Sequence, residues 1–157
     1  MRKRSMGLIL ASAVLGLVTA IPAAADEPFP NDANIWDPAA CSDPDSSGFK
    51  FHIYYNSGEA GAYRNIGYAV YDFDAIKATD KSYHVLTFCE LGVSRPWPGS
   101  GQHIKNNAAS GDNTHYKYTA RVYQRSGYWG NQDAMGPMQH HDQFLNVYND
   151  NASFQWT

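Results

Sequence analysis

The sequence predicts an all-β domain, and three observations favour this fold class. Apolar and polar residues alternate from Phe49 to Tyr55, with the period of a half-buried strand. A second pattern, an aliphatic residue and Tyr followed by Ser-Gly and a further Gly, occurs at 53–61 and again at 122–130. No stretch after residue 25 has a convincing helical period. Short strands separated by frequent turn signals are typical of a β sandwich.

The chain begins with a predicted secretory signal peptide over residues 1–25. Basic residues at 2–4 precede an uncharged apolar run over 6–21, and three alanines at 23–25 precede the expected cleavage site before Asp26. The apolar run is shorter than the roughly 20 residues that a membrane-spanning helix needs. We therefore expect a secreted, extracellular protein with no membrane partner, and a retained anchor is the alternative.

The charge of the expected mature chain argues against nucleic acid as a partner. Loss of Arg2, Lys3 and Arg4 would move the formal net charge from -3 to -6, because no acidic residue precedes Asp26. The remaining Lys and Arg residues are scattered singly and form no basic stripe that could neutralise phosphates. We expect a monomer with one domain, in which aromatic residues supply much of the core.

Residues 26–47 are predicted to be an extended leader. They are rich in Asp, Pro, Ala and Ser and have no apolar period, so we expect them to be fixed to the domain only through Cys41. An exported chain with a single pair of cysteines usually bridges them, which predicts a disulfide between Cys41 and Cys89. The alternative is a nucleophilic Cys89 with a histidine base, but no signature of a catalytic cysteine surrounds it.

The predicted domain, residues 48–157, contains two related units, each with a strand, a Gly turn and an Asn-rich loop. The first unit is longer than the second between its Gly turn and its Asn-rich loop. This insertion includes 75–82 and a Pro-rich loop within 93–105, which cannot be regular structure. Long irregular loops are often functional, and surface decoration is the open alternative. Further short strands are expected over 62–70, 85–91, 118–122 and 144–156.

The repeated pattern resembles the paired motifs of the βγ-crystallin superfamily. Each unit has aromatic residues, a Gly-bearing turn, a further Gly, and then an Asn/Asp pair followed by Ser, at 106–110 and at 149–153. The resemblance covers 49–157 and implies two tandem Greek-key motifs packed as one crystallin-like sandwich. A short exported domain of this kind is similar to secreted bacterial crystallin-fold peptidase inhibitors, typified by an inhibitor of metalloproteinases.

The resemblance also implies a site for calcium, because the superfamily can hold Ca²⁺ on the stretch Asn/Asp-Asn/Asp-x-x-Ser/Thr-Ser. The final Ser of that stretch is replaced by Gly111 and Phe154 here. With one charged side chain in the set, we expect weak binding, at roughly 10⁻⁴ to 10⁻³ M. Purely structural Asx and Ser/Thr turns are the alternative. The matching residues are Asn106, Asn107, Ala108 and Ser110 in the first loop, and Asn149, Asp150, Asn151 and Ser153 in the second.

Other candidates for chemistry are weaker. The chain has no nucleophile elbow, zinc signature or phosphate-binding loop, so we do not expect an enzyme. His140, His141 and Asp142 have metal-ligating side chains, but adjacent strand residues face opposite ways and no third ligand has a motif spacing. We interpret these three residues as a solvated loop.

Two classes of function remain, a peptidase inhibitor and a calcium-binding or purely structural extracellular domain. An inhibitor would present a rigid loop to an extracellular protease, with the disulfide and the β scaffold supplying preorganisation. Residues 95–98, Arg-Pro-Trp-Pro, are the most loop-like segment, and Arg95 and Trp97 are residue types favoured as binding anchors. The inhibitor family has two disulfides and this chain can form one, so Arg95 and Trp97 are proposed contacts on physical grounds alone.

Overall fold

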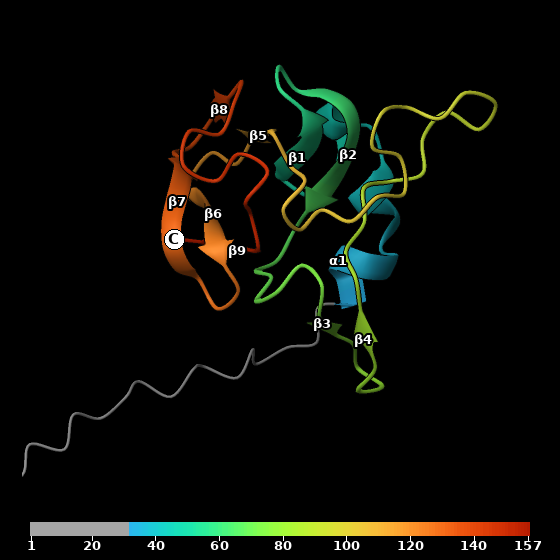
Figure 1. The fold of residues 1–157 in the computed structure, drawn as a ribbon, viewed down its shortest axis with the longest axis horizontal. Helices are drawn as coiled ribbons and strands as arrows, with labels where there is room; N and C mark the ends of the chain where they lie inside the picture. The colour runs from blue at the N-terminus through green and yellow to red at the C-terminus, as the bar shows by residue number, and fades with distance from the viewer. Residues whose placement is uncertain (1–31) are drawn as a thin grey trace, which may run out of the picture.

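A computed structural model describes residues 32–157 and has mainly antiparallel β strands (Figure 1), which confirms the all-β prediction. The predicted signal peptide and the start of the predicted leader lie outside the described residues. Within the described part of the chain, no helix is long and apolar enough to cross a membrane. The strands are β1 (Phe51–Asn56), β2 (Ala60–Ile66), β3 (Ile76–Lys77), β4 (Tyr83–His84), β5 (Ser110–Asn113), β6 (Ala120–Arg125), β7 (Trp129–Met135), β8 (Gln139–His141) and β9 (Ser153–Trp156).

Two antiparallel sheets contain most of these strands, in the orders β2-β1-β5-β8 and β7-β6-β9, and β3 pairs with β4 in a small third sheet. Each large sheet is built on a hairpin, β1–β2 or β6–β7. β8, from the second half of the chain, pairs with β5 in the first sheet. Conversely, Val70 from the first half forms a bridge to Phe154 of β9, with backbone hydrogen bonds of 2.7 and 2.9 Å. Each half of the chain therefore extends the sheet of the other half.

The two hairpins have the same backbone conformation. Both contain a register irregularity, between Tyr54 and Asn56 in one and between Tyr123 and Arg125 in the other. Three residues after each irregularity have positive φ, a conformation that glycine adopts without a steric penalty. They are Gly58, Glu59 and Gly61 in the first hairpin, and Gly127, Tyr128 and Gly130 in the second. The pattern that repeats in the sequence is thus a repeat of backbone structure.

Aromatic side chains join the two sheets, as the composition led us to expect. The ring of Phe51 in β1 stacks on that of Phe154 in β9, with centroids 4.4 Å apart and planes 3° from parallel. Gly111 of β5 lies close to the rings of Phe144 and Phe51, which a Cβ atom there would approach to 3.0 and 3.1 Å. The remaining core residues include Ile53, Val122 and Val147, all fully buried.

The prediction of an extended leader is wrong for residues 32–47. This segment forms the helix α1 (Asp32–Trp36) and two 3-10 helices, η1 (Pro38–Cys41) and η2 (Pro44–Ser46). Each 3-10 helix has an Asp at its N-cap and Pro at its start, a combination that satisfies the first free N–H groups. Elements this short bury single residues, Asn34 and Ala40, and so leave no apolar period in the sequence.

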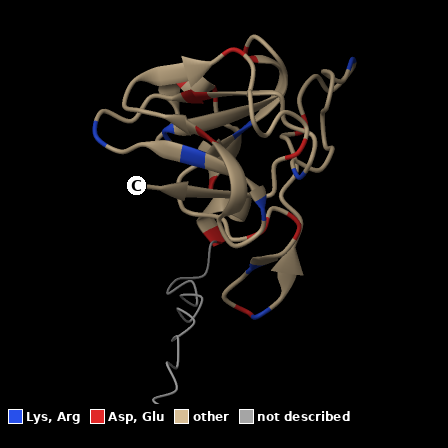
Figure 2. Ribbon diagram, turned by 60° about the vertical axis from the view of Figure 1, so that its left-hand side comes forward, with Lys and Arg blue, Asp and Glu red and all other residues tan. Residues whose placement is uncertain are grey.

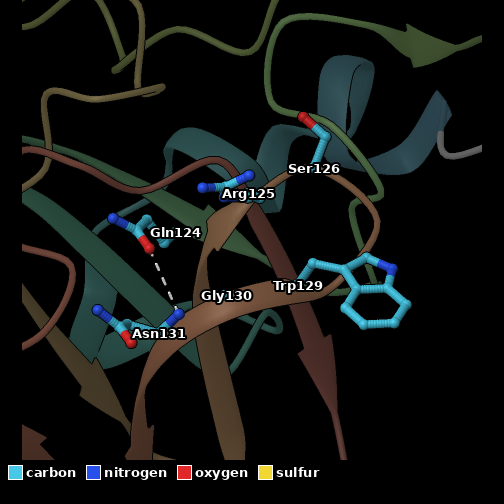
Figure 3. A pocket seen from close by; sticks show the side chains of 6 residues that line it. All are labelled: Gln124, Arg125, Ser126, Trp129, Gly130 and Asn131. Carbon is cyan, nitrogen blue, oxygen red and sulfur yellow. Dashed lines mark hydrogen bonds between the residues drawn. The ribbon is translucent and has the colours of Figure 1, made fainter.

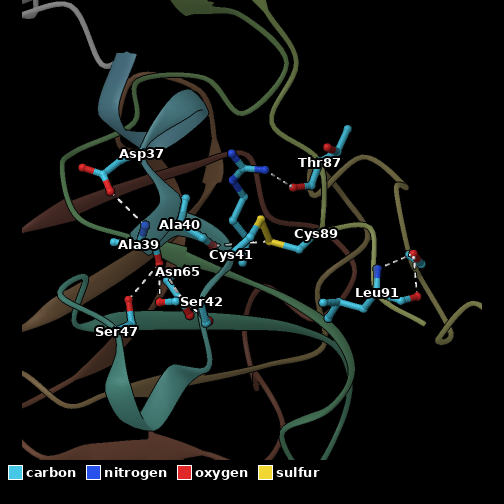
Figure 4. Close-up of a disulfide and its surroundings, with 12 residues drawn as sticks. Asp37, Ala39, Ala40, Cys41, Ser42, Ser47, Asn65, Thr87, Cys89 and Leu91 are labelled. Carbon is cyan, nitrogen blue, oxygen red and sulfur yellow. Dashed lines mark hydrogen bonds between the residues drawn. A yellow bond between two sulfur atoms is a disulfide. The ribbon is translucent and has the colours of Figure 1, made fainter. Parts of the chain in front are cut away.

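The predicted disulfide between Cys41 and Cys89 is confirmed, with Cα atoms 5.6 Å apart (Figure 4). It joins the end of η1 to the segment between β4 and β5. The N-terminal segment has other attachments, because the buried amide of Asn34 donates to the carbonyl of Tyr68 and accepts from the N–H groups of Gly67 and Tyr68. Residues 32–47 are therefore an integral part of the domain.

Candidate functional site

The two Asn-rich loops of the predicted calcium site lie against each other. The N–H of Asn106 donates to the carbonyl of Asn151 at 2.7 Å, and the N–H of Asn149 donates to the carbonyl of Ala108 at 2.9 Å. Asn106 and Asn149 both have positive φ, which asparagine tolerates better than most residues. The carbonyls of Ala108 and Asn151, two residues of the predicted calcium set, thus already accept hydrogen bonds between the loops.

The side chain of Asn151 strengthens this junction. Its Oδ1 accepts from the N–H groups of Asn107 and Ala108, at 3.2 and 3.0 Å, and its Nδ2 donates to the carbonyl of Ile104 at 3.0 Å. Asn151 is fully buried, so each of these bonds satisfies a polar group that would otherwise be costly to bury. The amide of Asn151 therefore has a structural role.

The two serines of the predicted calcium set each close a hairpin. Ser110 Oγ donates to the carbonyl of Asn56 at 2.6 Å and accepts from the N–H of Glu59 at 3.1 Å. Ser153 Oγ makes the equivalent bonds, to the carbonyl of Arg125 at 2.7 Å and from the N–H of Tyr128 at 3.1 Å. A hydroxyl has one proton and two lone pairs, so one lone pair on each serine remains for another partner.

Asp150 is the charged member of the set and lies at the surface, where it accepts a hydrogen bond of 2.6 Å from Gln124 Nε2. The structure thus brings both loops together, and the carbonyls of Ala108 and Asn151 and the side-chain oxygens of Ser110, Asn151 and Ser153 are engaged in internal hydrogen bonds. This bonding is what the structural-turn alternative expects. A calcium ion would have to share the carbonyls of Ala108 and Asn151 with the bonds that join the loops.

The Pro-rich loop, predicted within 93–105, is closed on itself over residues 91–101 in the structure. It projects beyond β2, as the yellow segment in Figure 1 shows. The hydroxyl of Ser100 bonds both to the N–H and to the carbonyl of Leu91, at 2.9 and 3.2 Å, and so closes the base of the loop. Within it, Trp97 N–H donates to Leu91 O at 3.1 Å, and Arg95 N–H donates to Gly92 O at 2.9 Å. Arg95 and Trp97 are thereby held in a defined turn.

The tip of this loop is exposed. Arg95 faces solvent, Val93 is completely exposed, and the indole of Trp97 is 48% exposed with one edge against Tyr63, at a centroid distance of 6.4 Å. Val93 was not a candidate from the sequence. In an irregular loop no periodic pattern shows whether a single aliphatic residue is buried or exposed. The predicted contacts Arg95 and Trp97 and the neighbouring Val93 are thus all exposed in the same loop.

A shallow hollow of about 440 Å³ lies on the second hairpin (Figure 3). The exposed indole of Trp129 borders it, and the side-chain oxygen of Gln124 accepts a hydrogen bond of 3.4 Å from the N–H of Asn131. The lining residues provide no carboxylate, imidazole or thiol. The hollow is lined by Gln124, Arg125, Ser126, Trp129, Gly130 and Asn131.

The interpretation of 140–142 as a solvated loop needs correction, because His140 and His141 lie on strand β8. As adjacent strand residues should, they face opposite ways. His140 Nδ1 lies 3.7 Å from Glu59 Oε1, whereas His141 Nδ1 lies 3.5 Å from Asp133 Oδ1. The sequence indicated no third metal ligand to join His140 and Asp142, and the structure supplies one, Glu59. Glu59 lies near His140 because β8 pairs with β5.

Comparisons of the chain with protein-family models, with curated proteins and with solved structures find no match. In the described part of the chain, charged residues are dispersed over the surface without a continuous basic face (Figure 2). The Pro-rich loop is the segment that combines a fixed base with an exposed apolar and basic tip.

Proposed function

We propose that this protein is a secreted peptidase inhibitor, a crystallin-like sandwich of two Greek-key motifs that binds an extracellular protease through its Pro-rich loop. The fold part of the proposal is supported by the matched hairpins and by the exchange of β8 and Val70 between the sheets. Ser110 and Ser153, which close the two hairpins in the same way, give further support.

The fixed base of the Pro-rich loop is the observation that carries the inhibitor proposal. Pro98 O accepts a hydrogen bond of 2.8 Å from Ala62 N–H of β2, and the Ser100–Leu91 bonds close the loop beside the disulfide at Cys89. A loop held in one conformation before docking loses less entropy on binding, which favours affinity. Pro96 and Pro98 reduce the freedom of the backbone further.

The exposed tip supplies the contacts in this proposal. Val93 and Trp97 offer apolar surface that a protease subsite can bury, and Arg95 offers a guanidinium with several hydrogen-bond donors. Bound in a protease cleft, such a stiff loop would occupy the substrate-binding surface and be cleaved slowly, because its ends are tied to the β scaffold and to Cys89.

The test is inhibition of a panel of secreted metallo- and serine proteases by the purified mature chain. We expect inhibition of at least one enzyme, and we expect Val93→Ala and Arg95→Ala to weaken it. The matched control is Leu145→Ala, which removes an aliphatic side chain that is exposed in the second half of the chain. The proposal fails if folded protein at micromolar concentration inhibits none of the enzymes, or if the control weakens inhibition as much.

The second candidate function is a calcium-binding or purely structural extracellular domain. The contact between the Asn-rich loops supports it, because the backbone groups of Asn106 and Asn149 join the two halves of the chain directly. In this case the Pro-rich loop would have no protease partner. An ion that binds only the folded chain would raise its stability in proportion to the logarithm of ion concentration above the dissociation constant.

A further inference from the structure

Three metal-ligating side chains converge beside the first hairpin. Glu59 lies at the β1–β2 turn, His140 lies on β8, and Asp142 directly follows β8. One ligand atom from each lies within 4.8 Å of the others. His140 stands between the two carboxylates, with Nδ1 at 3.7 Å from Glu59 Oε1 and Nε2 at 3.8 Å from Asp142 Oδ1.

The backbone that carries these side chains is firmly connected. Gly58 N–H donates to the carbonyl of Asp142 at 2.6 Å, which joins the hairpin directly to the segment after β8. The N–H of Glu59 donates to Ser110 Oγ at 3.1 Å and fixes its positive-φ conformation. His140 is held by the pairing of β8 with β5. The three ligands therefore start from a preformed scaffold, and only their side chains need to move.

The side chains have room to make that movement. His140 and Asp142 have side-chain exposures of 58% and 81%, and Glu59 has 31%. Ligands bound to one ion at about 2.0 to 2.2 Å lie closer together than the present separations. Rotation of the exposed side chains toward a shared centre would shorten the distances between the ligand atoms to those of a metal site. The exposed side of the cluster leaves space for water as a further ligand.

The local charge favours a cation. Within residues 32–157, no Lys or Arg forms an ion pair with Glu59, Asp142 or the neighbouring Asp112, which pairs with His140 across the β5–β8 ladder. A bound divalent ion would offset the repulsion between these carboxylates.

The second hairpin provides an internal comparison. In that hairpin, the N–H of Gly127 donates to the carbonyl of Tyr71 at 2.8 Å. This bond is the counterpart of the bond from Gly58 to Asp142. The positive-φ position of Glu59 is occupied there by Tyr128, and the rings of Tyr71 and Tyr128 pack edge to face at 5.8 Å. The same backbone arrangement thus carries aromatic residues in one half and metal-ligating residues in the other, so the fold itself does not impose the cluster.

We propose that Glu59, His140 and Asp142 bind a divalent transition-metal ion such as Zn²⁺. One imidazole nitrogen and two carboxylate oxygens suit Zn²⁺, Cu²⁺ or Ni²⁺, whereas Ca²⁺ and Mg²⁺ prefer ligand sets made of oxygen alone. With three ligands from the protein, the ion keeps a coordination position open to water. None of the three residues belongs to the Asn-rich loops, and the proposal does not depend on protease inhibition.

The test is isothermal titration of the mature protein with ZnCl₂, with CaCl₂ titrated in parallel. We expect one Zn²⁺ per chain. Single variants Glu59→Gln, His140→Gln and Asp142→Asn should each weaken binding at least about tenfold, the loss typical of removing even an outer-shell partner. Melting temperatures without metal should change little, because the altered side chains are at least partly exposed.

The matched control is His103→Gln. His103 is also an exposed histidine beside a carboxylate, with Nδ1 at 3.4 Å from Asp74 Oδ1, but no third metal-ligating side chain of the described residues completes a group there. This variant should bind Zn²⁺ as the unaltered protein does. The proposal is overturned if the protein shows no Zn²⁺ binding up to millimolar concentration, if His140→Gln binds as tightly as the unaltered chain, or if His103→Gln loses binding instead.

Discussion

His52 and Asn65 form a buried hydrogen bond across β1 and β2, with imidazole Nδ1 and amide Oδ1 2.8 Å apart. The amide is oriented by its own Nδ2, which donates to the carbonyls of Ala39 and Ser42, both at 2.8 Å. Oδ1 is therefore left to accept the hydrogen bond, and His52 donates it from Nδ1–H. Burial lowers the pKa of His52, and the bond to Asn65 offsets that effect in part. This pair connects the first sheet to the N-terminal segment.

The first prediction is a loss of stability in mild acid. Because the pKa of His52 is lower in the folded protein, the unfolded chain binds more protons as the pH falls below about 6.5. The contribution of His52 is therefore present above that pH and is lost as the pH falls through the folded-state pKa. Urea denaturation between about pH 7.5 and 5.5 should show a declining free energy of unfolding.

The control for this prediction separates His52 from the other titrating groups. His52→Gln should flatten the pH dependence of the free energy of unfolding in that interval, whatever its effect on stability at neutral pH. Glu59 and Asp112 act in the opposite direction, because their raised pKa values stabilise the folded state as the pH falls toward the carboxylate range. If the free energy of unfolding declines equally with pH in the unaltered chain and in His52→Gln, then His52 is not the cause of the decline.

The second prediction concerns Arg64 of β2, which is buried and forms no ion pair with a carboxylate among residues 32–157. Its guanidinium donates to Asn34 O at 3.1 and 2.7 Å, to Ile35 O at 2.9 Å and to Thr87 O at 3.0 Å. Burial lowers its pKa to about 10, so it stays charged at neutral pH. Arg64→Ala would leave these carbonyls unsatisfied and should reduce the free energy of unfolding by about 2 to 4 kcal/mol.

Limited proteolysis gives a second readout, because residues 32–47 should become accessible in Arg64→Ala before the sheets do. Arg121→Ala is the control, since Arg121 bonds only to the exposed side chains of Thr157 and Gln132, and its loss should cost less than about 0.5 kcal/mol. Equal stabilities of the two variants would show that Arg64 does not anchor the N-terminal segment.

The third prediction distinguishes the two interpretations of the Asn-rich loops. Ser153→Ala removes the partner of Arg125 O and Tyr128 N–H, so it should cost about 1 to 3 kcal/mol in the presence of a chelator. Structural turns predict the same cost with millimolar calcium. A calcium site predicts instead that the unaltered chain melts at a higher temperature with calcium, and that Asp150→Ala abolishes the increase.

The parts of the structure that were predictable have local signals. The repeated Ser-Gly turns of the hairpins have a signal in adjacent residues, because Gly58 and Gly127 both adopt positive φ, which glycine adopts without a steric penalty. The disulfide could be inferred because Cys41 and Cys89 are the only cysteines in the sequence. These inferences required no knowledge of how the strands are ordered.

The remaining features arise from long-range pairing. Glu59 lies near His140 because β8 joins the sheet that contains β1. No residue spacing in the sequence predicts this strand pairing. Arg64 is buried by a segment of short turns that has no periodic pattern, and its partners Asn34 O and Ile35 O are in place only when α1 is folded against β2. The calcium and inhibitor interpretations rest on resemblance and on loop geometry, and they stay predictions.

The fourth prediction concerns the aromatic anchor of the Pro-rich loop. If the loop contacts a protease, Trp97→Ala should weaken inhibition by roughly 2 kcal/mol, as expected for an anchor residue. Because one edge of Trp97 packs on Tyr63, a small fall in melting temperature should accompany this loss. Trp129→Ala is the matched control, since Trp129 is an exposed tryptophan on the second hairpin and should leave inhibition unchanged. Equal losses for both variants, or a loss that parallels unfolding in Trp97→Ala, would show that Trp97 supports the fold and does not bind the protease.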